Sequence, residues 1–177
     1  MDKYGYTRAE SILDEWNWAG DGYDWMETEQ GAALNAAMEI TMQRESVDVA
    51  TYYDAQPVIP YCGIFRLTDL TPTKAYYSLS YWNRLYTLRT ACAASAEGEN
   101  IYAYAACNGE RAALLISNYN GENKLTLELS HLPQGTLALR VTDQDRTDET
   151  LLTLSSGSHM TLTLDVQPCS VLLLETV

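Results

Sequence analysis

The chain has few basic residues and very few histidines. Eleven Lys and Arg stand against 24 Asp and Glu in 177 residues, which gives a formal net charge of −13, and there are 2 His. No segment is rich in Lys or Arg, so the chain would repel phosphate backbones and anionic membranes. We therefore expect neither nucleic acid nor a membrane as a partner. The acidic composition fits a soluble protein that acts on neutral substrates, and it equally fits solubility alone.

Long apolar segments are also missing. No segment approaches the roughly 18 consecutive apolar residues of a membrane span, and residues 1–6 lack the apolar core of a signal peptide. These absences are compatible with a soluble protein of the cytoplasm and with a secreted one.

The cysteines form no CxxC pair and have no His at ligand spacing; they are Cys62, Cys92, Cys107 and Cys169. A zinc site is therefore not expected, and the sequence predicts no other metal and no cofactor. An expected hairpin at residues 90–107 would put Cys92 and Cys107 on one face, in diagonal positions. Packed free thiols are the favoured interpretation of these cysteines.

Phenylalanine is nearly absent, with one Phe beside 13 Tyr and 4 Trp. Tyr and Trp combine an apolar ring with a polar edge, which suits partly wet surfaces, sugar-stacking sites among them. A large share of these rings should nevertheless lie in the core or in an interface.

The first half of the chain alternates expected strands with expected helices. The order is a strand at Ser11–Asp14, a helix at Gln30–Arg44, a strand at Val47–Tyr53 and a helix from Pro72 to Leu85. Pro72 suits the first turn of its helix, and Thr71 is the expected N-cap. Strands separated by helices of this length are what parallel βαβ units require.

The second half has an antiparallel pattern of short strands separated by turn signals such as Asn108-Gly109 and Asn120-Gly121. The expected strands are Ile101–Ala106, Arg111–Asn118, Lys124–Leu129, Leu137–Asp143, His159–Asp165 and Ser170–Glu175. Short strands at this spacing predict a β-sandwich. We expect two domains, residues 1–88 and residues 89–177.

The most informative segment is the end of the first strand, where an apolar stretch gives way abruptly to Asp14-Glu15-Trp16-Asn17. A buried parallel strand delivers a catalytic acid to the C-terminal rim of a (β/α)₈ barrel in this way. Without that context, Glu15 would be a solvated carboxylate at a strand end. Asp14 is more simply explained as a structural acceptor of backbone hydrogen bonds.

Several aromatic and polar residues flank this carboxylate. Trp16, Asn17 and Trp18 are candidates for binding a sugar, although core packing explains the tryptophans equally well. Tyr53 and Asp54, near the end of the second strand, are candidates for lining the same pocket.

Two downstream motifs accompany the first. They are Tyr-Tyr-Asp at residues 52–54 and Pro-Thr-Lys-Ala-Tyr-Tyr at residues 72–77, with the Ala-rich helix at 30–44 between the strands. With these motifs, the first half resembles the last two βα units of a clan A glycoside hydrolase barrel. The second half resembles the β-sandwich that such enzymes often append. The likeness is greatest to the xylosidases of family 39 and the arabinofuranosidases of family 51.

The resemblance implies roles for particular residues. In those families a strand ends in Glu, an aromatic residue and Asn, and that Glu is the nucleophile, so Glu15 is the expected catalytic residue. A retaining glycosidase also needs a second carboxyl group, roughly 5–5.5 Å away, to protonate the leaving oxygen. In this clan the acid/base Glu follows an Asn at the end of the fourth barrel strand. Glu99 and Glu122 only precede an Asn, in sandwich turns, so the acid/base is expected to be absent.

A typical barrel has roughly 250 residues, whereas residues 1–88 hold two expected strands. The expected fold class is therefore α/β followed by all-β. A partial (β/α)₈-barrel remnant of about two βα units precedes an antiparallel β-sandwich. The resemblance implies a fragment of a retaining glycoside hydrolase that acts on a neutral hemicellulose-type glycoside, a xyloside or an arabinofuranoside, and is inactive alone. The alternative is a non-catalytic carbohydrate-binding or structural β-sandwich module.

Partners follow from the same interpretation. Carbohydrate would be the substrate of the complete enzyme. The strands at Ser11–Asp14 and Val47–Tyr53 would lack neighbours along their edges, and exposed edges recruit other chains unless they are covered. We therefore expect a homo-oligomer.

Overall fold

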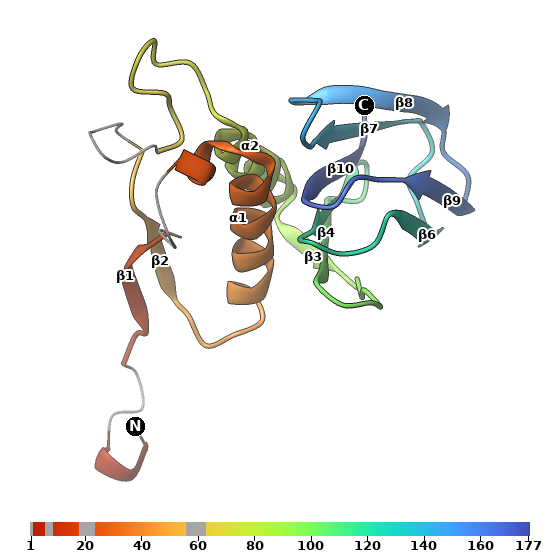
Figure 1. Cartoon of the computed structure of the whole chain (residues 1–177). Helices are drawn as coiled ribbons and strands as arrows, with labels where there is room; N and C mark the ends of the chain where they lie inside the picture. The colour runs from red at the N-terminus through yellow and green to blue at the C-terminus, as the bar shows by residue number, and fades with distance from the viewer. Residues whose placement is uncertain (1, 6–8, 18–23, 56–62) are drawn as a thin grey trace.

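The computed structural model describes residues 2–5, 9–17, 24–55 and 63–177. The first part holds short 3₁₀ turns at Asp2–Tyr4 and Asp24–Glu27, β1 (Ile12–Trp16), α1 (Glu29–Met42), β2 (Val49–Tyr52) and α2 (Lys74–Leu88). The second part holds β3 (Thr90–Cys92), β4 (Ile101–Cys107), β5 (Ala112–Asn118), β6 (Lys124–Ser130), β7 (Thr136–Thr142), β8 (Glu149–Ser155), β9 (His159–Asp165) and β10 (Ser170–Thr176). Figure 1 shows β1 and β2 on one side, α1 and α2 in the middle and the remaining strands on the other side.

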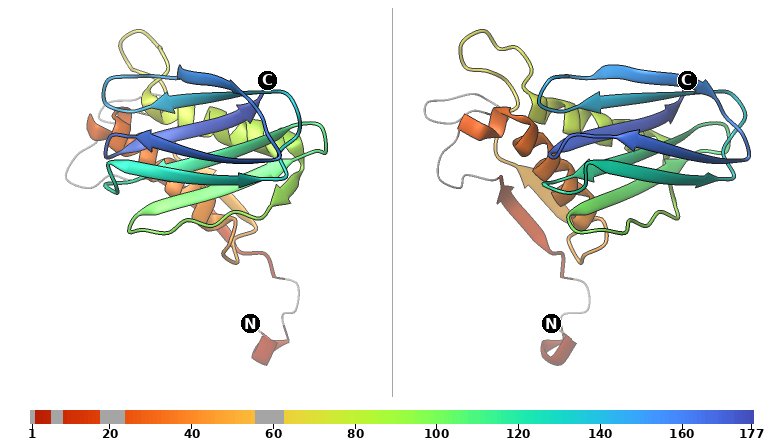
Figure 2. Two further views of the ribbon diagram at one scale, coloured as in Figure 1. Left: turned by 90° about the vertical axis from the view of Figure 1, so that its right-hand side faces the viewer. Right: turned by 45° about the vertical axis from the view of Figure 1, so that its right-hand side comes forward.

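The strands of the second part form a sandwich of antiparallel sheets, as expected. One sheet has the order β3-β4-β5-β10-β7-β8, and the other pairs β6 with β9 (Figure 2). The sequence missed β8, whereas β3 is the first arm of the hairpin expected at residues 90–107. In β8 the side chains are exposed or half-buried throughout, because the strand lies at the edge of its sheet. Since few of its positions are buried, its sequence shows only a weak apolar pattern.

β10 lies in the middle of the larger sheet and is buried along its whole length. Val171 and Leu173 join a core with α1 and α2, whereas Leu172 and Leu174 join the core between the sheets. Since alternate residues of a strand face opposite sides, β10 must be apolar on both faces. The sheet is therefore covered by helices on one side and by β6–β9 on the other.

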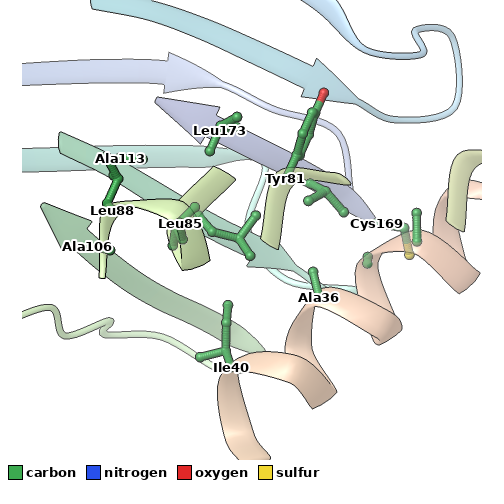
Figure 3. Close-up of a cluster of buried hydrophobic side chains, with 13 residues drawn as sticks. Ala36, Ile40, Tyr81, Leu85, Leu88, Ala106, Ala113, Cys169 and Leu173 are labelled. Atoms are coloured by element: carbon green, nitrogen blue, oxygen red, sulfur yellow. The ribbon is translucent and has the colours of Figure 1, made fainter. Parts of the chain in front are cut away.

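α1 is rich in Ala because it is covered on more than one side. Ala32, Ala33 and Ala36 are fully buried beside Ile40, and small side chains let the helix approach the larger sheet closely (Figure 3). In α2 the buried apolar and small side chains recur at helical spacing on one face, at Ala75, Ser78, Tyr81, Leu85 and Leu88. The helices and the larger sheet thus share one core.

The predicted start of α2 is wrong by two residues. The N-cap position is held by Thr73, whose side chain makes no capping bond, and the helix begins at Lys74. Pro72 instead forms a bridge with Phe65, and the Thr71 hydroxyl donates a 2.7 Å hydrogen bond to Asp69. A residue before proline is biased toward extended backbone, which keeps Thr71 outside the helix.

The hairpin between β3 and β4 confirms the diagonal placement of two cysteines, because Thr90 pairs with Cys107 and Cys92 pairs with Ala105. Cys92, Cys107 and Cys169 are free thiols. Cys62 lies outside the described residues. None of the helices in the described ranges is both long enough and apolar enough to span a bilayer.

Candidate functional site

The candidate site lies at the carboxyl ends of β1 and β2, which pair in parallel as expected. In the described part of the chain these strands form a sheet of their own, and no closed barrel is present. Their register is irregular at this end. Between the pairs Leu13–Ala50 and Trp16–Tyr52, β1 advances by three residues and β2 by two.

The extra residue of β1 falls on Asp14 and Glu15, and both side chains are exposed. A bulge leaves a residue unpaired and re-aims side chains, and bulges are over-represented beside active sites. The carboxylate of Glu15 is therefore presented to solvent at the strand end. Within the described residues, the Asp14 side chain makes no hydrogen bond that would support the expected structural role.

Two hydrogen bonds close the sheet just beyond Glu15. The Asn17 side-chain Nδ2 donates to the Tyr53 carbonyl at 2.6 Å, and the Tyr53 N–H donates to the Trp16 carbonyl at 3.0 Å. Tyr53 is 37% exposed. The structure thus brings Glu15, Asn17 and Tyr53 to the same end of the sheet.

Trp16 packs against the neighbouring strand. Its ring meets that of Tyr52 edge to face, with centroids 5.1 Å apart, and Trp16 is half-buried. This contact uses one part of the indole for packing. Trp18 lies outside the described residues.

Behind the strands, α1 supplies a buried polar group. The Asn35 side-chain Nδ2 donates a 3.4 Å hydrogen bond to the Tyr52 phenol oxygen. Burial raises the pKa of that phenol above its usual range. Hydrogen bonds with Asn35 and Asn17 oppose the shift, and the charges of Glu39 and Asp54 add to it.

Glu39 is the most perturbed acid of this region. It follows Asn35 by one helical turn and is 5% exposed, and neither carboxyl oxygen has a hydrogen-bond partner among the described residues. Burial raises the pKa of Glu39 to about 8, since a desolvated carboxylate is unfavourable. The acid is therefore mostly protonated at neutral pH.

Sequence reasoning did not single out Asn35 or Glu39, and it named Tyr52 only as part of the Tyr-Tyr-Asp motif at residues 52–54. The available signal was weak: a polar pair at i and i+4 in an otherwise Ala-rich helix. Among the described residues, no three His, Cys, Asp or Glu side chains gather in a group that could hold a metal ion.

Comparison with known proteins reveals likeness in structure. No protein-family model matches the chain, and no curated protein matches it either. The glucosidase from Croceicoccus marinus superposes with a TM-score of 0.82 and 23% identity, over 99% of this chain and 48% of that chain.

Two xylan-degrading or xyloside-degrading enzymes are also similar. A GH39 β-xylosidase from Caulobacter crescentus gives a TM-score of 0.69 and 14% identity, over 96% of this chain and 44% of that one. A GH30 endoxylanase from Clostridium papyrosolvens C71 gives a TM-score of 0.65 and 15% identity, over 98% of this chain and 43% of that one. The resemblance to clan A glycoside hydrolases is thus confirmed for the fold, and the chain spans less than half the length of each of these enzymes.

Proposed function

We propose that this chain is the nucleophile-bearing part of a retaining glycoside hydrolase. The observation that carries the proposal is the exposed carboxylate of Glu15 in an irregular stretch at the carboxyl end of a parallel strand. Active sites of (β/α)₈ enzymes lie at this end of the strands. The shared fold supports interpreting β1–α1–β2–α2 as about two βα units of such a barrel. On this view residues 1–88 are the barrel segment and residues 89–177 the sandwich domain.

In the proposed reaction, Glu15 attacks the anomeric carbon and forms a covalent glycosyl-enzyme intermediate, which water then hydrolyses with retention of configuration. A second carboxylic acid must protonate the leaving oxygen and later activate the water. We propose that this acid comes from outside the present sequence, so the chain is inactive alone. The proposed substrate is a neutral hemicellulose-type glycoside, a xyloside or an arabinofuranoside.

The residues around Glu15 would hold the sugar. Asn17 carries a side-chain amide and Tyr53, 37% exposed, carries a phenol ring, and both lie at the end of the sheet that presents Glu15. Trp16 and Trp18 remain proposed substrate-binding residues, with Trp16 contributing what its packing on Tyr52 leaves accessible.

A chimera tests the proposal directly. The part of the Croceicoccus marinus glucosidase that this chain matches is replaced by the chain, and folding is checked by circular dichroism and thermal unfolding. We expect the folded chimera to release nitrophenol from an aryl glycoside. Glu15→Gln should lower turnover by several orders of magnitude, because the covalent step is lost.

Glu10→Gln and Asp14→Asn are matched controls, since both carboxylates are exposed in the same segment. They should leave most of the turnover intact. A folded chimera whose turnover is indifferent to Glu15→Gln would contradict the proposal. A folded chimera without turnover would favour the alternative, a non-catalytic carbohydrate-binding or structural β-sandwich module.

A further inference from the structure

A hollow of about 270 Å³ lies away from Glu15, where the C-terminal half of α2 meets β3 and β4. Its lining comprises Gln43, Trp82, Leu85, Tyr86, Arg89, Thr90, Ala91, Tyr104 and Ala106. Leu85 and Ala106, both labelled in Figure 3, also belong to the core beneath it. The hollow therefore lies against the core that the helices share with the larger sheet.

Aromatic rings form its walls. Trp82 and Tyr104 are half-buried, with ring centroids 5.1 Å apart and planes inclined by 54°, and both pack against the core. Tyr86 is 59% exposed and stands at the rim. The side chains at its floor are small, because Ala91 of β3 and Ala106 of β4 are directly paired there.

The rim carries polar groups held in place by local structure. The Arg89 guanidinium lies over the Tyr86 ring, 4.5 Å from its centroid. The Arg89 backbone is left-handed, with φ of 73°, and its N–H donates to the Tyr86 carbonyl. These contacts orient the guanidinium before any ligand arrives.

The opposite wall is tied down as well. Arg44, which follows Gln43 after α1, donates from Nη2 to the Ala103 carbonyl at 2.7 Å and to the Ala94 carbonyl at 3.4 Å. These bonds join the end of α1 to β4 and to the segment after β3. The hollow is thus formed by elements that are fixed to one another.

We infer that this hollow binds a single neutral sugar ring. A sugar ring has apolar C–H faces that fit aromatic walls and hydroxyl groups at its edge that fit the amide of Gln43, the guanidinium of Arg89 and the hydroxyl of Thr90. The volume of the hollow lies just below the roughly 300–1,000 Å³ of ordinary ligand pockets, so it suits one sugar ring better than an oligosaccharide. The net charge of −13 disfavours an anionic ligand.

The test is a titration of the ¹⁵N-labelled chain with methyl β-D-xyloside and methyl β-D-glucoside, followed by NMR. We expect saturable shifts at the backbone amides of Arg89, Thr90 and Ala91 and at the Trp82 indole, with a dissociation constant in the roughly millimolar range. Tyr86→Ala should weaken binding roughly tenfold, because a stacking ring is lost. Its exposure makes this substitution compatible with folding.

Tyr4→Ala is the matched control, because Tyr4 is 70% exposed and carries Lys3 over its ring at 4.8 Å, yet lies in another part of the chain. It should leave the titration unchanged. The inference is overturned if the hollow's signals do not shift, if Tyr86→Ala binds as well as the unmodified chain, or if the shifts gather around Glu15 and Tyr53. Tighter binding of glucuronate or adenosine than of either glycoside would overturn the ligand class. None of these outcomes depends on whether Glu15 is a nucleophile.

Discussion

The side chain of Asn17 and the backbone of Tyr53 are joined by a 2.6 Å hydrogen bond across the end of the β1–β2 sheet. The bond lies two residues beyond Glu15 and directly follows the irregular register of β1. It couples the residues that directly follow both strands, so the backbone that presents Glu15 is fixed relative to Tyr53. The candidate site is therefore a property of the strand pair, with each strand supplying part of it.

The isolated chain should have negligible activity on aryl xylosides, arabinosides and glucosides. Under the proposed function the acid/base carboxyl group is supplied from outside the present sequence, and general acid catalysis contributes about 10²–10⁴-fold to such reactions. The activity is measured as the rate of nitrophenol release above the rate in buffer without protein. Turnover well above background that disappears in Glu15→Gln would contradict this prediction.

Stability should fall as the pH rises from about 4.5 toward 8 because of Glu39. Its pKa rises from 4.5 to about 8 on burial, so the folded chain binds more protons than the unfolded chain in this window. Proton loss therefore favours unfolding, by on the order of a few kcal/mol once the pH passes 8. Urea unfolding midpoints at pH 5, 7 and 9 measure the effect.

Glu39→Gln should flatten this pH dependence and make the chain more stable than the unmodified protein at pH 9. Glu45→Gln is the control, because Glu45 is exposed just after the same helix. An unchanged slope in Glu39→Gln would show that other groups cause the pH dependence.

The ion pair between Arg84 of α2 and Glu175 of β10 should contribute to stability. Glu175 is 4% exposed and Arg84 is 39% exposed, so Arg84→Met would leave a buried carboxylate without its counter-charge. Solvent at Arg84 reduces the cost below that of a fully buried pair, to roughly 1–3 kcal/mol in the free energy of unfolding. Chemical denaturation measures it.

Two comparisons make that experiment specific. Arg84→Met combined with Glu175→Gln should recover part of the loss, because no unpaired charge remains. Lys124→Met breaks the pair with Asp165, whose side chains are 66% and 89% exposed, and should be nearly neutral. Equal losses in Arg84→Met and Lys124→Met would argue against the burial explanation.

The chain should self-associate through the β1–β2 sheet. Ile12 and Val49 are directly paired, and they are 58% and 44% exposed. Exposed sheet edges and apolar surface of this kind favour association. Light scattering at micromolar concentration should give a mass above that of a monomer, and Ile12→Lys with Val49→Lys should lower it. A monomer mass for the unmodified chain would contradict the prediction.

In hydrogen exchange, we expect the backbone amides of α1 and α2 to be protected as strongly as those of the sandwich. Both helices share a core with β4, β5 and β10, and buried, well-packed amides open only with the whole unit. β1 and β2 should exchange faster. If the helices exchange as fast as β1 and β2, the boundary between cooperative folding units would instead lie between residues 88 and 89.

Local patterns predicted much of the fold. Alternating apolar residues mark β6, because one of its faces is solvated and the other packs against the larger sheet. The Ala-rich pattern marks α1, with bounds within two residues of those observed. The edge strand β8 was missed because its exposed side chains leave a weak apolar pattern, and the start of α2 was misplaced because Pro72 keeps Thr71 outside the helix.

The candidate site, like the fold, could be predicted only in part from the sequence. The residue order by itself determined the carboxylate at a strand end, the aromatic and amide residues after it, the acidic surface and the antiparallel second half. Only the tertiary structure decided that β1 gains a residue at Glu15, that Tyr52 packs on Trp16, and that both faces of the larger sheet are covered. It also decided that Glu39 is buried. A helical pattern tells which side chains share a face, but the burial that raises a pKa is set by whichever distant strands come to lie on that face.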